Sequence, residues 1–359
     1  CTLVPHRVQL RFVLATMLIF LLGACTATTG THSDDVANML EPVGGRVETW
    51  AEIETASVLH GPLPTAEPFD ERLLPDTKEA QPIPVAAQHA ALDSPNSSSP
   101  MILEPSPLPL VDFAGLSFVN TAIPPDTHGA VGPEHLMIVL NTQVGILQKS
   151  GTPAAPPVSI TAWWSGLGVN RAFDPRVSFD VLANRWIFVA LADPRQASSA
   201  VLLAVSHTSD PTGTWSRFKI AADASALQWA DYPNIGFNRN WIIVTTNQYL
   251  RSNDAYATSR ILAFPKAALF NNAAPSAVPL EFEYDLAGTL VPASTYSADL
   301  DSEYVLGSIN GNVDGQGALR LFSIQPTGST ATWTNGPYVV TSSPWANGGT
   351  VNFAPQQGS

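Results

Sequence analysis

Three aspartates lie in short turns that contain proline, and a hydrophobic run follows each turn. The three turns are Pro125-Asp126-Thr127, Asp174-Pro175-Arg176 and Asp231-Tyr232-Pro233. Carboxylates that converge from separate turns can bind Ca²⁺ through their oxygens, or a cationic or polyhydroxyl ligand. The alternative is that each aspartate only caps its own turn by accepting backbone N–H bonds. The first interpretation predicts Asp126, Asp174 and Asp231 as a metal set, with Ca²⁺ as the possible ion.

Other side chains in these turns could also contact a ligand. A histidine beside an aspartate, as His128 is beside Asp126, could act as a general base, although satisfied structural histidines are the commoner case. Aromatic rings in predicted loops could stack on sugars or pack in the core; they are Trp163, Trp164, Trp229 and Tyr232. No residue is predicted to be catalytic. The predicted ligand-binding residues are Asp126, His128, Asp174, Arg176, Asp231 and Tyr232.

Several kinds of chemistry find no support in the sequence. It contains no Gly-x-Ser-x-Gly, His-Glu-x-x-His or Walker pattern. Its cysteines are Cys1 and Cys25, so the body has neither a disulfide nor a thiolate metal site. The net charge of −13 without clustered lysine or arginine argues against nucleic acid as a partner. Two of the aspartates could form a glycosidase pair, but the sequence does not give their separation.

Short hydrophobic runs separated by Gly, Pro, Asn and Asp dominate the chain from Val111 onward, which predicts an all-β body. The clearest predicted strands are 136–140, 144–148, 186–191, 201–206, 241–246, 260–264, 304–309 and 319–324.

The aspartate turns recur at a coarse period. They fall at positions 126, 174 and 231, and Asp299 could mark a fourth unit. Propeller blades run ~40–50 residues, with insertions in loops. The spacing therefore predicts a β-propeller of four-stranded blades, with about four to five blades present and the aspartates at one rim of the channel. A β-sandwich is the alternative, but it does not require the turns to recur.

The first 25 residues have the layout of an export signal. A basic start with Arg7 and Arg11 is followed by an apolar run over 12–22 and by Leu22-Gly23-Ala24-Cys25. We expect a signal peptide over 1–24, a Pro-rich acidic and disordered linker over 25–110, and the propeller over 111–359. Within the linker, 45–59 could form a short helix.

Two resemblances follow from these residues. Leu22-Gly23-Ala24-Cys25 resembles the lipobox of bacterial lipoproteins, which implies lipidation of Cys25 and a membrane anchor on the extracytoplasmic face. Residues 123–135, IPPDTHGAVGPEH, resemble the opening motif PPDTxGAVGPxH of a group of bacterial secreted β-propeller proteins. The likeness covers roughly 113–359 and implies architecture and location, but no activity. It also implies that further blades follow, so that the propeller here is C-terminally truncated. His128 departs from the group's usual asparagine.

The sequence therefore favours a surface-exposed, lipid-anchored propeller that binds an extracellular protein or glycan without catalysis. One alternative is a glycan-active hydrolase that uses the aspartates at the channel mouth. Another is a structural adhesin module. Contact with a membrane is expected through the N-terminal lipid only.

Overall fold

The computed structural model describes residues 38–39, 45–60, 108–117, 122, 124–285, 289–313, 316–327 and 330–340. Every described residue belongs to one compact unit, Asp34–Ser359. The signal peptide predicted over 1–24 and Cys25 lie outside the described residues. Within the described part of the chain, no helix has both the length and the apolar character that a membrane span requires.

Four antiparallel sheets follow one another along the chain. The first sheet consists of β3 (His128–Val131), β4 (His135–Val139), β5 (Gln143–Gln148) and β6 (Pro153–Ser159). The second contains β7 (Ala172–Asp180), β8 (Arg185–Ala192), β9 (Ala200–Ser206) and β10 (Thr214–Ala221), with β2 (Gly45–Thr49) added beside β10.

The third sheet contains β11 (Gln228–Phe237), β12 (Trp241–Leu250), β13 (Tyr256–Pro265) and β14 (Leu280–Tyr284), with β1 (Asn38–Met39) added beside β14. The fourth consists of β15 (Val291–Pro292), β16 (Glu303–Val313), β17 (Gln316–Thr327) and β18 (Thr330–Val340). The three described helices are α1 (Trp50–His60), α2 (Ile160–Trp163) and α3 (Lys266–Leu269).

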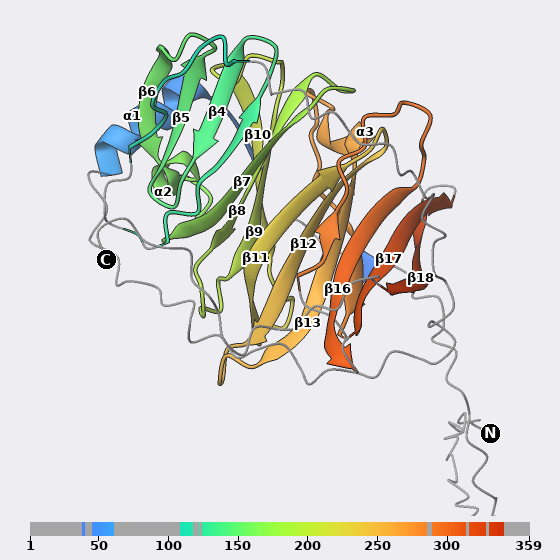
Figure 1. The fold of residues 1–359 in the computed structure, drawn as a ribbon. Helices are drawn as coiled ribbons and strands as arrows, with labels where there is room; N and C mark the ends of the chain where they lie inside the picture. Colours follow the sequence, from blue (N-terminus) through green and yellow to red (C-terminus); the bar gives the residue numbers. More distant parts are fainter. Residues whose placement is uncertain are drawn as a thin grey trace, which may run out of the picture. The chain divides into compact units, whose positions relative to one another are not determined.

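The first strand of each sheet lies beside the first strand of the next. β3 contacts β7, β7 contacts β11, and β11 contacts β15, while the later strands of each sheet fan outward (Figure 1). Sheets stacked side by side, with their first strands gathered together, have the arrangement of propeller blades. The prediction of an all-β propeller with four-stranded blades is confirmed, and the described residues form four blades.

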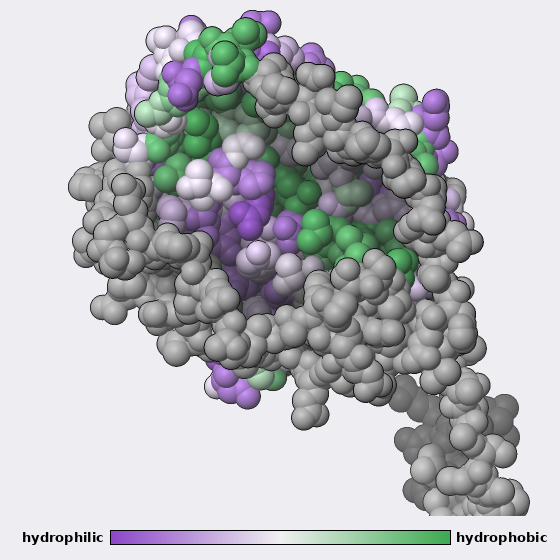
Figure 2. Space-filling model, viewed as in Figure 1, coloured by the Kyte–Doolittle hydropathy of each residue, from purple (hydrophilic) through white to green (hydrophobic). Residues whose placement is uncertain are grey.

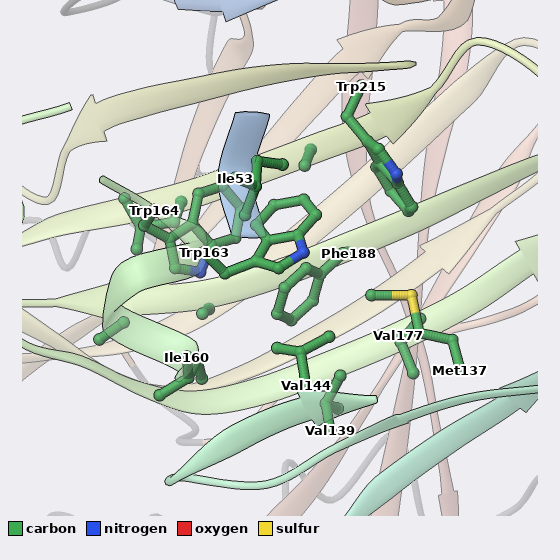
Figure 3. Packing of buried hydrophobic residues seen from close by; sticks show 14 of the residues in the cluster. Ile53, Met137, Val139, Val144, Ile160, Trp163, Trp164, Val177, Phe188 and Trp215 are labelled. Carbon is green, nitrogen blue, oxygen red and sulfur yellow. The ribbon is translucent and has the colours of Figure 1, made fainter. Parts of the chain in front are cut away.

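The core lies between successive blades. Strands β8 and β9 are buried almost throughout, because neighbouring blades cover both faces of the second sheet. One cluster joins the first and second blades, a second joins the second and third, and another joins the third and fourth. In the first cluster Trp163 and Trp164 pack against Phe188, and Trp163 also packs against Trp215 (Figure 3). Hydrophobic side chains pointing both ways from a strand thus hold the blades together.

A buried group of charges also links the blades. Lys266, which directly follows β13 of the third blade, pairs with Asp180 from the second blade. The Lys266 ammonium lies 4.8 Å from the centre of the Phe237 ring. Glu303 of the fourth blade is fully buried near Lys266, and burial raises its pKa to about 8. The neutral form of the Glu303 carboxyl group is therefore favoured near pH 7.

Seven of the eight predicted strands fall within observed strands, and the eighth, 136–140, extends one residue beyond β4. Two other expectations are wrong. Residues 45–59 do not form one helix, because 45–49 pair with β10 as strand β2 before α1 begins at Trp50. The segment 25–110 is therefore not a linker throughout. Asp299 does not begin the fourth blade, whose first strand β15 already lies at Val291–Pro292.

Candidate functional site

In each blade, one residue within or just before the first strand has a left-handed backbone conformation. The φ angles are 44° at Asp126, 50° at Asp174, 52° at Tyr232 and 55° at Thr289. We call these four residues the blade corners. Positive φ is uncommon in residues other than glycine, and for a bulky residue such as tyrosine it is an outlier. In β7 and β11 the strand register shifts at this point.

The third corner differs from the sequence prediction by one residue. The register shift runs from Phe173 to Arg176 in β7 and from Asp231 to Asn234 in β11. Tyr232, and not Asp231, therefore occupies the place that Asp174 has in the preceding blade. Asp231 remains in the ladder, where it pairs with Asn247 of β12.

The corners connect each blade to the one before it. The backbone N–H of Asp174 donates to Asn141 Oδ1 of the first blade at 2.7 Å. The N–H of Tyr232 donates to Asp174 Oδ2 at 3.3 Å, and that of Thr289 donates to Asn247 Oδ1 at 2.7 Å. A side chain from one blade thus satisfies a partly buried backbone donor of the next, which fixes the distance between neighbouring inner strands.

The three predicted aspartates do come together. Asp126 accepts a hydrogen bond from the Asn141 amide, and the carboxyl groups of Asp174 and Asp231 share a hydrogen bond. Asp174 and Asp231 are only 5% and 2% exposed. Burial raises the pKa of Asp231 to about 6, and the nearby Asp126 adds to the rise. Because both partners of the shared bond are carboxyls, one of them must carry the proton.

The predicted cation site is not formed. The described ranges contain no group of three or more His, Cys, Asp or Glu side chains that could hold a metal ion. Arginine balances part of the negative charge instead, since Arg195 lowers the pKa of Asp231. Arg195 itself is held by Asp254 at 2.6 Å and lies over the Trp229 ring at 5.0 Å. The set Asp126, Asp174 and Asp231 therefore acts mainly as a link between blades.

The other predicted ligand residues form a second group, which we call the inner-strand row: His128, Arg176 and Tyr232. The three residues come from the first, second and third blades. His128 Nδ1 accepts the backbone N–H of Val177 at 3.3 Å, beside Arg176. The Arg176 guanidinium lies 5.7 Å from the centre of the Tyr232 ring, and its Nε donates to the carbonyl of Pro233 at 3.1 Å.

The protonation state of His128 follows from these contacts. Burial lowers the pKa of His128, and the positive charge of Arg176 lowers it further. The ring is therefore neutral near pH 7. Because Nδ1 accepts a hydrogen bond, the proton of the neutral ring is on Nε2, which makes Nε2–H a donor. With the Arg176 guanidinium, the row offers donors and no carboxylate.

Only one of the four candidate stacking aromatics is available to a ligand. Trp163, Trp164 and Trp229 are fully buried in the clusters between blades, which confirms the core interpretation for them. Tyr232 is 43% exposed. The face drawn in Figure 2 has a hollow in its middle, where hydrophilic and hydrophobic residues lie next to each other.

Sequence reasoning missed Asn141, Asn247 and Thr289. A signal existed for Asn247, because it belongs to the polar stretch 245–248 inside a strand whose neighbours are hydrophobic. Thr289 gave no signal by residue type, since its role depends on its backbone conformation and its N–H group.

No family model matches this chain, and no curated protein matches it. Among solved structures, an alpha-L-arabinanase from Cellvibrio cellulosa aligns with a TM-score of 0.32 and 11% identity, covering 60% of this chain and 72% of the arabinanase. A point mutant of the same arabinanase aligns equally well.

Proposed function

We propose that this protein is exported, anchored through a lipid on Cys25, and displays its propeller outside the cytoplasm to bind an extracellular glycan or protein without catalysis. The observation that carries the binding role is the inner-strand row. It joins an exposed aromatic ring to an arginine and to a histidine donor across three blades. The lipobox-like Leu22-Gly23-Ala24-Cys25 supports export and lipid anchoring.

The chemistry of the row favours a ligand rich in oxygen acceptors. An exposed tyrosine face can stack on the apolar side of a sugar ring or of another aromatic group. Arg176 and the Nε2–H of His128 then supply donors for hydroxyl, carbonyl or carboxylate oxygens. The strained φ of 52° at Tyr232 agrees with this role, because residues held in rare conformations cluster at functional sites.

Hydrolysis is the second candidate function, and the raised pKa of Asp231 is the observation in its favour, because catalytic acids need such a shift. The geometry of the pair opposes it. Glycosidases hold their two carboxyl groups ~5–9.5 Å apart, on either side of the scissile bond. Asp174 and Asp231 share a hydrogen bond and are nearly inaccessible to solvent, which leaves no room for a sugar between them. A purely structural adhesin module would need neither group of residues.

A glycan array and a panel of chromogenic glycosides, both with the full-length protein, test the proposal. We expect binding without turnover, and at least a tenfold loss of affinity in Tyr232→Ala. Tyr296→Ala is the matched control, because Tyr296 is a more exposed tyrosine at 62% and lies outside the row. Turnover that Asp231→Asn abolishes would establish the hydrolase instead. Equal binding by both tyrosine variants would remove the inner-strand row as the site.

A further inference from the structure

The N-terminal segment between residues 38 and 60 lies outside the four-stranded repeat, yet it contacts three blades. We call its described parts, 38–39 and 45–60, the strap. β1 pairs with β14 at the outer edge of the third blade, and β2 pairs with β10 at the outer edge of the second. Helix α1 packs against α2 and β6 of the first blade. The described parts of the strap thus contact the outermost strands of three consecutive blades, β14, β10 and β6.

Hydrogen bonds and charges hold β2 in place. Five residue pairs form the ladder between β2 and β10. The Glu48 carboxylate pairs with the guanidinium of Arg217, which is fully buried and also donates to the carbonyl of Ser165 at 3.1 Å. Burial lowers the pKa of Arg217 to about 9. Without Glu48 this guanidinium would lose its paired carboxylate, and an unpaired buried charge is costly.

Hydrophobic packing holds the helix. Trp50 and Ile53 are buried members of the cluster between the first two blades. Ile53 lies beside Trp163 and Trp164 in Figure 3. A capping box starts α1, since Thr49 N–H donates to Glu52 at 2.7 Å and Glu52 N–H donates back to Thr49 Oγ1 at 3.3 Å. The strap is therefore part of the folded body and not an accessory to it.

Because the strap is part of the folded body, it shortens the stretch of chain that connects Cys25 to the propeller. The stretch from Cys25 to Asn38, where the strap begins, is short, because a chain of about 13 residues reaches no more than about 45 Å when fully extended. A free spacer from Cys25 to Leu110, of about 85 residues, would reach about 300 Å when fully extended. Residues 61–107 start at α1 and end before Phe113, which lies against Gly151 of the first blade. Both ends of that stretch are on the folded body, so its length does not increase the distance that can separate Cys25 from the propeller.

We infer that the strap holds the propeller close to the membrane, so that the stretch between Cys25 and the strap sets the height of the binding surface. This inference rests on the proposed lipid anchor. It implies a ligand that lies near the cell's own surface, such as envelope glycan or a neighbouring membrane protein, and not a distant extracellular target.

Two matched insertions test the inference. The full-length protein, purified from membranes and reconstituted in supported bilayers, is compared with variants that carry the same 20-residue Gly-Ser segment after Gly30 or after Ser98. Neutron reflectometry measures the gap between the bilayer and the protein layer. We expect the insertion after Gly30 to widen the gap by roughly 10 Å, because the average tether length scales with the square root of its residue count. The insertion after Ser98 should leave the gap unchanged.

Equal widening by the two insertions would overturn the inference, because a free tether over 25–110 cannot distinguish them. No widening by either would overturn it as well. Failure of the anchor is a separate result, since it appears as no labelled palmitate on Cys25 and no change in membrane recovery in Cys25→Ser. In that case the same two insertions are compared after chemical coupling of the Cys25 thiol to a maleimide lipid, in a chain with Cys1→Ser.

Discussion

The carboxylate of Asp174 accepts the backbone N–H of Tyr232 at 3.3 Å, and in this way the second blade holds the corner of the third. The same carboxyl group shares a hydrogen bond with Asp231. One side chain therefore supports both the exposed tyrosine and the buried acid beside it. The inner-strand row and the pair Asp174 and Asp231 therefore meet at the same contact between the second and third blades.

Replacing Asp174 tests this contact. Asp174→Ala removes both hydrogen bonds, leaves buried donors without partners and places alanine at a φ of 50°. We expect it to lower the free energy of unfolding by about 2–3 kcal/mol. Asp174→Asn keeps an oxygen acceptor and tolerates the left-handed conformation, so its loss should be about 1 kcal/mol. Urea denaturation measures both. An equal loss in the two variants would mean that neither the acceptor nor the conformation matters.

The buried acid makes stability depend on pH. The pKa of Asp231 is about 6 in the folded protein and near 3.8 when unfolded, so between these values the folded state binds more protons. The contribution of Asp231 to the free energy of unfolding is then largest below pH 4 and falls as the pH rises to 6, by ~3 kcal/mol in total. Asp231→Asn should lose this slope. A wild-type curve that rises over pH 4–6 relative to the variant would contradict the assignment.

Glu303 produces a second pH effect, in a different range. Its pKa is raised to about 8 from 4.5, so its contribution to the free energy of unfolding falls as the pH rises between these values. Glu303→Gln removes the ionisation and should be more stable than wild type by about 4 kcal/mol at pH 8.5, with little difference at pH 4. Thermal unfolding at the two pH values measures this. Glu303→Gln leaves the ion pair between Lys266 and Asp180 in place, so the Lys266 ammonium keeps a charged partner in the variant.

The corner conformation at Tyr232 has a cost that can be measured. Tyr232→Gly and Tyr232→Ala both remove the ring, but only glycine adopts a φ of 52° without strain. We expect the glycine variant to be about 1 kcal/mol more stable than the alanine variant, and both to lose ligand binding. Calorimetric unfolding compares the two. Equal stability would show that the backbone relaxes when the ring is removed.

Most of the architecture could be predicted from the sequence, because alternating strands and turn residues repeat in each blade. Aligning the three aspartates predicts the third corner at Asp231, one residue before its observed position at Tyr232. Aligning Pro175 with Pro233 instead gives the observed register, since each proline directly follows its corner residue.

Other features could not be predicted from local sequence. Strand β2 has a charged, alternating pattern, and its pairing depends on a strand far along the chain. The shared hydrogen bond of Asp174 and Asp231 depends on how two blades meet. The burial of Trp163 and Trp164 depends on the neighbouring blade, because residue type alone does not tell a rim aromatic from a core aromatic.

The position of β2 in the chain has a consequence for how the protein folds. Thr49 pairs with Thr214, so most of the first two blades is made between the two strands. At ~5–20 residues per second, a ribosome needs on the order of 10–30 seconds to make the second strand after the first. During that interval an early segment with the hydrophobic side chains of Trp50 and Ile53 has no partner. The second blade is therefore completed late, and its closure should be the slow kinetic phase of refolding.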